Sequence, residues 1–159
     1  MQPLPYSESC FVCGHENEAG LRLRFFRDGA TVRCRCTLDD HYSGFLDRTH
    51  GGILATLVDE TMGWATVVAA NRFTYTVELS VRFRLPVAVG EPLDIAAWVN
   101  RHTRRLSYAE AEIRNSTGDT LVSAQGKFMV ASAEETESTA GLLLYDPGAW
   151  RFEDATVSR

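Results

Sequence analysis

The chain lacks an excess of positive charge and an obvious membrane segment. Its 16 Lys and Arg residues are outnumbered by 21 Asp and Glu residues, giving a formal net charge of -5, whereas nucleic-acid binding needs a basic surface. No uninterrupted apolar run reaches the ~20 residues of a membrane span. The opening MQPLPYSESC has neither the basic start nor the apolar core of a signal peptide. We therefore expect a cytoplasmic protein that binds neither nucleic acid nor membrane.

A second Cys-x-x-Cys pair is also missing. Cys10 and Cys13 in CFVCG have the spacing that can bind zinc or exchange thiols, and His15 with Cys34 or Cys36 could complete four ligands. A zinc ribbon would need another such pair, and Cys34 and Cys36 share the inward parity of a strand. The sequence therefore favours packed, reduced thiols, with zinc or a redox role as alternatives. No metal and no cofactor is predicted.

The length and pattern of the chain predict one domain with two extensions. A chain of 159 residues can bury one sizeable core. We expect an N-terminal arm with the Cys-x-x-Cys turn over 1–20, a domain over 21–131, and an acidic C-terminal tail over 132–159. The tail begins with SAEETESTAG, which is typical of a solvated, flexible segment. The following LLLYDPGAWRF could dock on a groove or a partner.

Hydrophobic periodicity predicts one long helix among several strands. The helix runs over 52–70, and in the strand after it Thr76 falls on the polar face. Asp28 and Gly29 are a hairpin signal between the first two strands. The result is an α+β fold in which one antiparallel sheet wraps a central helix. The alternating segments that predict strands are 21–27, 31–38, 74–85, 93–101, 105–114 and 120–130.

The helix carries two adjacent carboxylates on different stripes. At about 100° per residue, Asp59 shares a stripe with small residues such as Gly63, which leaves a groove where a ligand can approach. Glu60 lies in line with bulky residues such as Trp64. If buried there, Glu60 would need a partner, and at a subunit edge it could form an ion pair. Asp59 taken alone could equally be a solvated or hydrogen-bonded carboxylate at a sheet edge.

The helix start adds hydrogen-bond donors. Gly51 and Gly52 have no Cβ, so their N–H groups can approach a carbonyl oxygen that gains negative charge. Alternatively, the two glycines form a tight joint and His50 bonds locally. Gly51 and Asp59 are eight residues apart, which at about 1.5 Å per residue is roughly 12 Å. If both act on one carbonyl, they come from two chains, which predicts a homodimer with shared sites.

These segments resemble a known family. HGGILATLVDETMG, followed by TVELSVRFRLPVAVGE, is similar to the hotdog-fold thioesterases of the PaaI-like and 4-hydroxybenzoyl-CoA thioesterase group, over roughly residues 20–131. The resemblance implies the hotdog fold and hydrolysis of a fatty or aromatic acyl-CoA by carboxylate-activated water. It leaves open whether homodimers pair into tetramers. The alternative function is a non-catalytic acyl-CoA-binding protein, a sensor or partner-binding module.

The resemblance also implies roles for individual residues. Asp59 would be the general base or nucleophile, with Glu60 as the adjacent alternative. Gly51 would supply the oxyanion N–H, His50 would orient the thioester, and Thr76 would help to hold the attacking water.

Coenzyme A carries phosphates, so we expect basic residues near its binding site. The densest basic segment is NRHTRR, where Arg104 and Arg105 are predicted substrate-binding residues together with Gly52. The alternative for these arginines is a solvated strand end.

Overall fold

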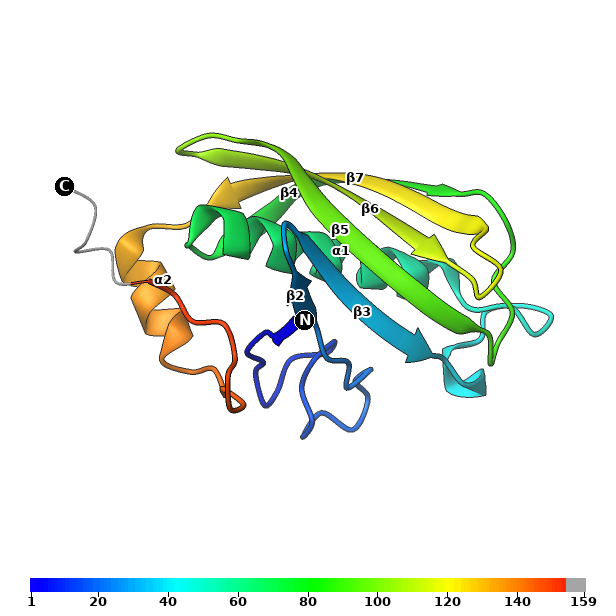
Figure 1. The fold of residues 1–159 in the computed structure, drawn as a ribbon. Helices are drawn as coiled ribbons and strands as arrows, with labels where there is room; N and C mark the ends of the chain where they lie inside the picture. Colours follow the sequence, from blue (N-terminus) through cyan, green and yellow to red (C-terminus); the bar gives the residue numbers. More distant parts are fainter. Residues whose placement is uncertain (154–159) are drawn as a thin grey trace.

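The computed structural model describes residues 1–153 and shows one curved sheet over a long central helix, α1 (Figure 1). The sheet has seven strands in the order β1-β2-β3-β5-β6-β7-β4, with every neighbouring pair antiparallel. This confirms the predicted α+β class. The strands are β1 (Gln2–Pro3), β2 (Phe26–Asp28), β3 (Thr31–Thr37), β4 (Thr74–Phe83), β5 (Pro92–His102), β6 (Leu106–Arg114) and β7 (Thr120–Val130).

Helix α1 (Gly51–Ala70) begins one residue earlier than predicted and is buried on most sides. Apolar residues all round a helix require a cover on each side, and here the sheet supplies most of it. The buried residues of α1 are Leu54, Leu57, Val58, Thr61, Met62, Trp64, Ala65, Thr66 and Val67.

The expectation that no segment could span a membrane needs a correction. By length and composition α1 could cross a bilayer, because its most apolar window has a mean hydropathy of 1.3. Half of that window is buried inside the fold. The sheet therefore accounts for the apolar residues of α1 as part of a protein core.

The predicted strand over 21–27 is wrong for most of its length, because only residues 26–28 form β2. Leu21 and Leu23 are buried as the alternation predicted. Their N–H groups donate to the carbonyls of Phe11 and Val12, both at 2.8 Å, so this segment bonds to the N-terminal arm instead of to a sheet neighbour. The remaining predicted strands, 105–114 included, are confirmed with end shifts of one or two residues, and 120–130 matches β7.

The start of the tail is helical, which corrects the expectation of a flexible segment. Helix α2 (Ala133–Ala140) begins with a capping box, in which the side chains of Ser132 and Glu135 each accept from the other's backbone N–H. Two orphan donors are satisfied in this way. A short 3₁₀ helix, η1 (Asp40–Tyr42), precedes the loop to α1.

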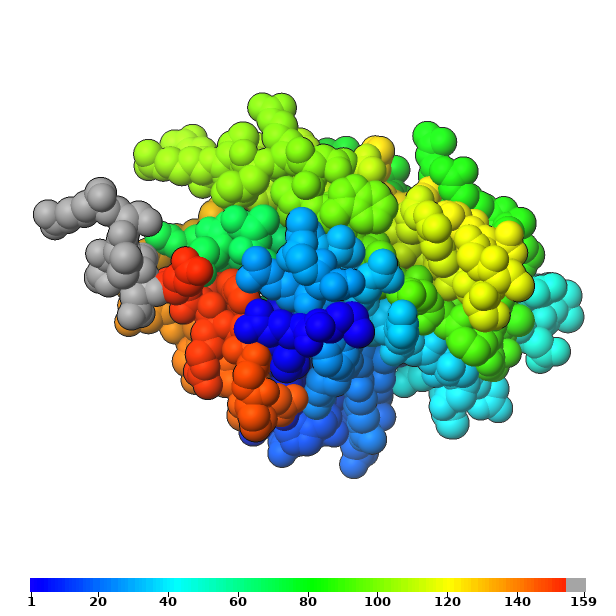
Figure 2. Space-filling model, viewed as in Figure 1, coloured from blue at the N-terminus to red at the C-terminus, as the bar shows by residue number. Residues whose placement is uncertain are grey.

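The segment after α2 docks on the chain itself. Tyr6 and Leu144 exchange backbone hydrogen bonds, and the Trp150 N–H donates to the Pro3 carbonyl at 2.9 Å. Trp150 is buried and packs against Phe152. Figure 2 shows the first residues, in dark blue, beside the orange and red C-terminal segment. The division at 20/21 and 131/132 stays a prediction, and the predicted tail extends beyond the described residues to 159.

Candidate active site on helix α1

The helix begins at a histidine cap. His50 is the N-cap residue of α1, and its Nδ1 accepts the Gly52 N–H at 2.9 Å. A neutral imidazole whose Nδ1 accepts carries its proton on Nε2, so His50 presents Nε2–H as a donor. Gly52 was predicted to bind substrate, but its N–H is already used by His50. A Cβ on residue 52 would lie 2.9 Å from Nδ1, so glycine permits this cap.

Gly51 keeps a free donor at the same helix end. Within residues 1–153 its N–H has no hydrogen-bond acceptor. The nearest atoms to a Cβ built on Gly51 belong to the Phe83 ring, 3.5 Å away. This N–H points from the positive end of the helix dipole, so Gly51 suits an oxygen that gains negative charge.

Asp59 lies on the small-residue stripe of α1, which is partly open. Gly52 is exposed, and Ala55, Thr56 and Gly63 are only half-buried, as is Asp59 itself. Thr76 Oγ1 donates to Asp59 Oδ1 at 2.9 Å. Burial raises the pKa of Asp59, and the hydrogen bond from Thr76 partly opposes this by lowering it. A carboxylate with one bonded oxygen, one free oxygen and a raised pKa can act as a general base.

A bulge in β4 explains how Thr76 reaches Asp59. The pairing of β4 with β7 shifts register between Thr76 and Glu78. The bulge inserts one extra residue and reverses the parity of the side chains beyond it. Thr76 therefore faces α1 on the same side as Leu79 and Val81, which pack against the core. The alternation in the sequence predicted Thr76 on the polar face of the strand, with Leu79 on the other face, and this prediction was wrong.

One chain does not bring Gly51 and Asp59 together. Both lie on the continuous helix α1, so their Cα atoms are separated by roughly 12 Å along its axis. His50 lies with Gly51 at the helix start, and Thr76 lies with Asp59 near the middle. One chain therefore holds two separate groups: a donor end, formed by His50 and Gly51, and a carboxylate centre, formed by Asp59 and Thr76.

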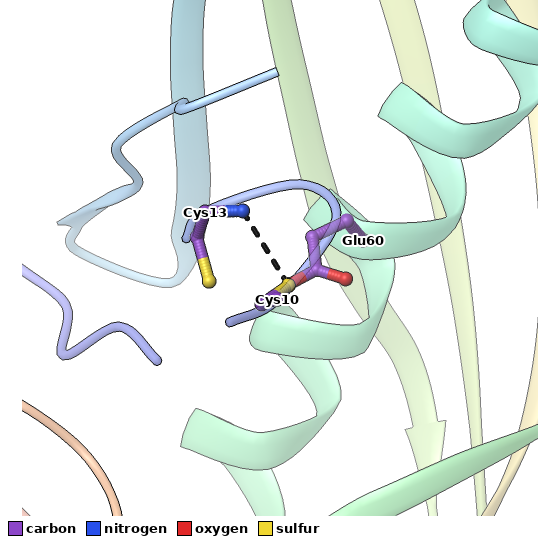
Figure 3. Close-up of side chains that lie close together, drawn as sticks. All are labelled: Cys10, Cys13 and Glu60. Atoms are coloured by element: carbon purple, nitrogen blue, oxygen red, sulfur yellow. Dashed lines mark hydrogen bonds between the residues drawn. The ribbon is translucent and has the colours of Figure 1, made fainter. Parts of the chain in front are cut away.

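Glu60 has a different environment from its neighbour Asp59. It lies under the Cys-x-x-Cys turn of the N-terminal arm, where the ligand atoms of Cys10, Cys13 and Glu60 are all within 4.8 Å of one another (Figure 3). Burial, followed by the nearby Cys10 and Asp59, raises the pKa of Glu60 to about 8. His15, predicted from the sequence as a possible fellow ligand of the cysteines, is not in this group. In the sequence, the only sign of this group was that Glu60, if buried, would need a partner.

Arg104 and Arg105 lie far from the donor end. They form the turn between β5 and β6, and the Arg105 carbonyl accepts the Val130 N–H at 2.9 Å. Val130 pairs with Thr74, the first residue of β4 after α1 ends. Within one chain, both arginines are therefore at the opposite end of α1 from Gly51. Their predicted role in substrate binding stays a prediction.

Comparison with known proteins adds family information to this geometry. The sequence profile described as "Thioesterase superfamily" matches residues 47–122, which include the helix and both carboxylates. The chain is therefore similar to the thioesterase superfamily over this segment. It is 32% identical over 99 residues to "Putative esterase F42H10.6" of Caenorhabditis elegans, a match that covers 62% of this chain and 58% of that protein. It is 26% identical over 95 residues to mouse acyl-coenzyme A thioesterase 13, covering 59% of this chain and 67% of that protein.

Solved structures of the thioesterase superfamily share the hotdog fold with this chain. Protein RHA08564, a thioesterase superfamily protein, superposes with a TM-score of 0.70 at 28% identity, covering 75% of this chain and 62% of that one. The E. coli PaaI protein gives 0.67 at 20% identity, with coverages of 74% and 88%. Streptococcus mutans smu.793, solved with acetyl CoA bound, gives 0.64 at 16% identity, with coverages of 69% and 89%. The predicted hotdog fold and family resemblance are confirmed.

Proposed function

We propose that this chain is a thioesterase that hydrolyses fatty or aromatic acyl-CoA thioesters with water activated by Asp59. The observation that carries the proposal is the Thr76–Asp59 hydrogen bond of 2.9 Å on the open stripe of α1. It leaves Asp59 Oδ2 free for a proton. The acyl-CoA thioesterase relatives and the acetyl CoA bound to smu.793 support this substrate class.

The proposed reaction accounts for each proton. Asp59 Oδ2 takes a proton from water while the water oxygen bonds to the thioester carbonyl carbon. The Gly51 N–H donates to the carbonyl oxygen as it becomes negative. The carbon–sulfur bond then breaks with its electron pair on sulfur, and the proton on Asp59 passes to the coenzyme A thiolate. Thr76 donates to Asp59, so its oxygen remains an acceptor that can hold the water.

Gly51 and Asp59 must come from different chains in this mechanism. We propose a homodimer in which two α1 helices lie antiparallel with their small-residue stripes together. An apolar edge supports it: β4 ends the sheet, and Tyr75, Val77 and Phe83 are 47%, 57% and 55% exposed. Exposed apolar patches on a sheet edge commonly mark subunit contacts. Each dimer would hold two equivalent sites.

The experiment that tests the activity measures free thiol released from short, medium, long and aromatic acyl-CoAs. Wild type and Asp59→Asn are compared side by side, with Glu60→Gln as the matched neighbouring carboxylate. We expect the Asp59→Asn variant to lose about 10²–10⁴-fold in kcat, the usual contribution of a general base, and Glu60→Gln to lose less. Acyl-CoA binding by Asp59→Asn, measured by calorimetry, should persist because the change is isosteric.

Two results would overturn the proposal. A larger loss of kcat in Glu60→Gln than in Asp59→Asn would show that Glu60, and not Asp59, is the general base. Tight acyl-CoA binding without turnover of any substrate by wild type would instead identify the alternative, a non-catalytic acyl-CoA-binding protein.

A further inference from the structure

Glu60 is a carboxylate on the bulky stripe of α1 without a cationic partner. In the part of the chain that the structure describes, no Arg, Lys or His nitrogen lies within 4.0 Å of its oxygens. Cys10 and Cys13 lie beside it, in a turn that closes over α1 (Figure 3). Carboxylates covered in this way are commonly paired with a cation or coordinate a metal ion.

The Cys-x-x-Cys-Gly turn is shaped to hold a thiolate at Cys10. Cys10 Sγ accepts the N–H groups of Val12 at 3.3 Å and Cys13 at 3.4 Å, and the Gly14 N–H donates to the Cys10 carbonyl at 2.9 Å. A Cβ on Gly14 would lie 2.4 Å from the Cys10 carbonyl oxygen, so only glycine closes the turn. N–H donors aimed at sulfur favour its negative form.

The turn is also anchored from behind. The Leu23 N–H donates to the Val12 carbonyl at 2.8 Å, and Arg24 Nη1 donates to the Cys13 carbonyl at 2.6 Å. One backbone bond at Val12 and one side-chain bond at Cys13 thus hold the turn in place over α1. The two cysteines and Glu60 thus form a preorganised group assembled from segments far apart in the sequence.

We propose that Cys10, Cys13 and Glu60 bind one zinc ion that fastens the N-terminal arm to α1. Two thiolates and a carboxylate form a mixed sulfur and oxygen set that suits zinc and excludes magnesium and calcium, which require oxygen ligands. With Zn–S bonds of about 2.3 Å and Zn–O bonds of about 2.0 Å, tetrahedral ligand atoms are roughly 3.5–3.8 Å apart. The ligand atoms of Cys10, Cys13 and Glu60 lie within 4.8 Å of one another, which is compatible with this spacing.

The surroundings of Glu60 match those of a metal ligand. Trp64 Nε1 is buried, has no hydrogen-bond acceptor among residues 1–153, and lies one helical turn after Glu60 on the same face of α1. The indole N–H can bond the oxygen of Glu60 that does not ligate, as outer groups around metal sites commonly do. Three ligand charges against Zn²⁺ leave one negative charge, which Arg24 behind the turn offsets. Water would be the fourth ligand.

This inference is independent of the proposed hydrolysis, and its test does not measure activity. Full-length protein is purified without chelator, and zinc is measured by mass spectrometry. We expect about one zinc per chain. Replacement by Co²⁺ should give the visible bands of a tetrahedral site and a thiolate-to-cobalt charge-transfer band. Less than about a tenth of an equivalent of zinc after reconstitution, without the cobalt bands, would overturn the proposal. A Cys10–Cys13 disulfide in zinc-supplied protein would overturn it too.

Matched variants locate the ligands. Cys10→Ser and Glu60→Gln should reduce bound zinc about tenfold or more, since each removes a ligand. Cys36→Ser, a half-buried cysteine in β3, and Asp59→Asn, the adjacent carboxylate, should keep it. Equal zinc in Glu60→Gln and Asp59→Asn would exclude Glu60 as a ligand. Because the cobalt spectrum is recorded on the unaltered chain, the test does not depend on any variant folding.

Discussion

Asp59 and Glu60 are adjacent carboxylates on two different faces of helix α1, and their surroundings differ in almost every respect. Asp59 faces small residues and open space, and its hydrogen-bond partner is Thr76 on the edge strand β4. Glu60 faces bulky residues and lies under the arm, beside Cys10 and Cys13. A rotation of about 100° per residue separates the two carboxylates. The comparison teaches that neighbours in a helical sequence can face unrelated surroundings, and we propose that one faces a ligand and the other fixes the fold.

After Asp59→Asn, the largest expected effect is at the donor end of the open face. Gly51→Pro removes the free N–H, and we expect kcat/KM for acyl-CoA to fall about 10²–10³-fold, as for other oxyanion donors. Proline suits the first helical position, and His50 already has the extended backbone, with ψ 133°, that precedes proline. Gly51→Ala is the control because it keeps the N–H. Equal rates in the two variants would refute the oxyanion role.

Mixing Gly51→Pro chains with Asp59→Asn chains tests the shared site. If Gly51 and Asp59 come from different chains, a mixed dimer has one intact site. Random pairing should then restore about a quarter of wild-type activity, since half of the dimers are mixed. No recovery after verified exchange of subunits would show that each chain works alone.

On the covered face, Gly14→Ala should destabilise the protein by about 1–3 kcal/mol, the usual cost of forcing a methyl group into a closed space. The added Cβ would meet the Cys10 carbonyl oxygen at 2.4 Å. Thermal unfolding measures the effect. Gly141→Ala is the control, because its nearest atoms would lie 3.6 Å away. Equal melting temperatures would show that the arm does not depend on this turn.

Thr76→Val should reduce kcat/KM about tenfold, because Asp59 loses a hydrogen bond to its charged form. That bond lowers the pKa of Asp59, so its loss raises the pKa further. A general base acts only when deprotonated, and the acidic limb of the rate profile should therefore move to higher pH. Thr76→Ser keeps the hydroxyl and should keep the limb. An unchanged pH–rate profile in Thr76→Val would show that Thr76 does not influence the general base.

The smallest effect is expected at the helix cap. His50→Ala should cost about 1 kcal/mol in the free energy of unfolding, the typical value of an N-cap. His50→Asn should restore this stability, since asparagine caps helices well, but it lacks Nε2–H. If His50 orients the thioester, both variants raise KM. Denaturant unfolding measures the capping role of His50, and steady-state kinetics measure its contact with the thioester. An unchanged KM in His50→Asn would show that His50 serves only as the helix cap.

Much of the fold could be predicted from local patterns. The alternation in 120–130 and the apolar helix correspond closely to β7 and α1, because burial of one face imposes a period on the residues. The same rule was wrong at 21–27, where Leu21 and Leu23 are buried but bond to the arm. Periodicity reports which side chains are buried, not which backbone their segment pairs with.

The candidate site was predicted only in part. His50, Gly51 and Asp59 lie where the motif put them, since one continuous helix sets their spacing. The side of β4 occupied by Thr76 was missed, because a bulge depends on the pairing of two strands. The roles of these residues, the dimer, and the cytoplasmic location stay predictions.

By itself, the sequence determined the helix, its two carboxylate stripes and the glycines at its start, because helical geometry relates residues only a few positions apart. Tertiary structure alone decided which carboxylate would be covered. Cys10 and Cys13 reach Glu60 because the arm folds back through backbone hydrogen bonds at Leu21 and Leu23, and no short-range pattern encodes a contact between segments so distant along the chain.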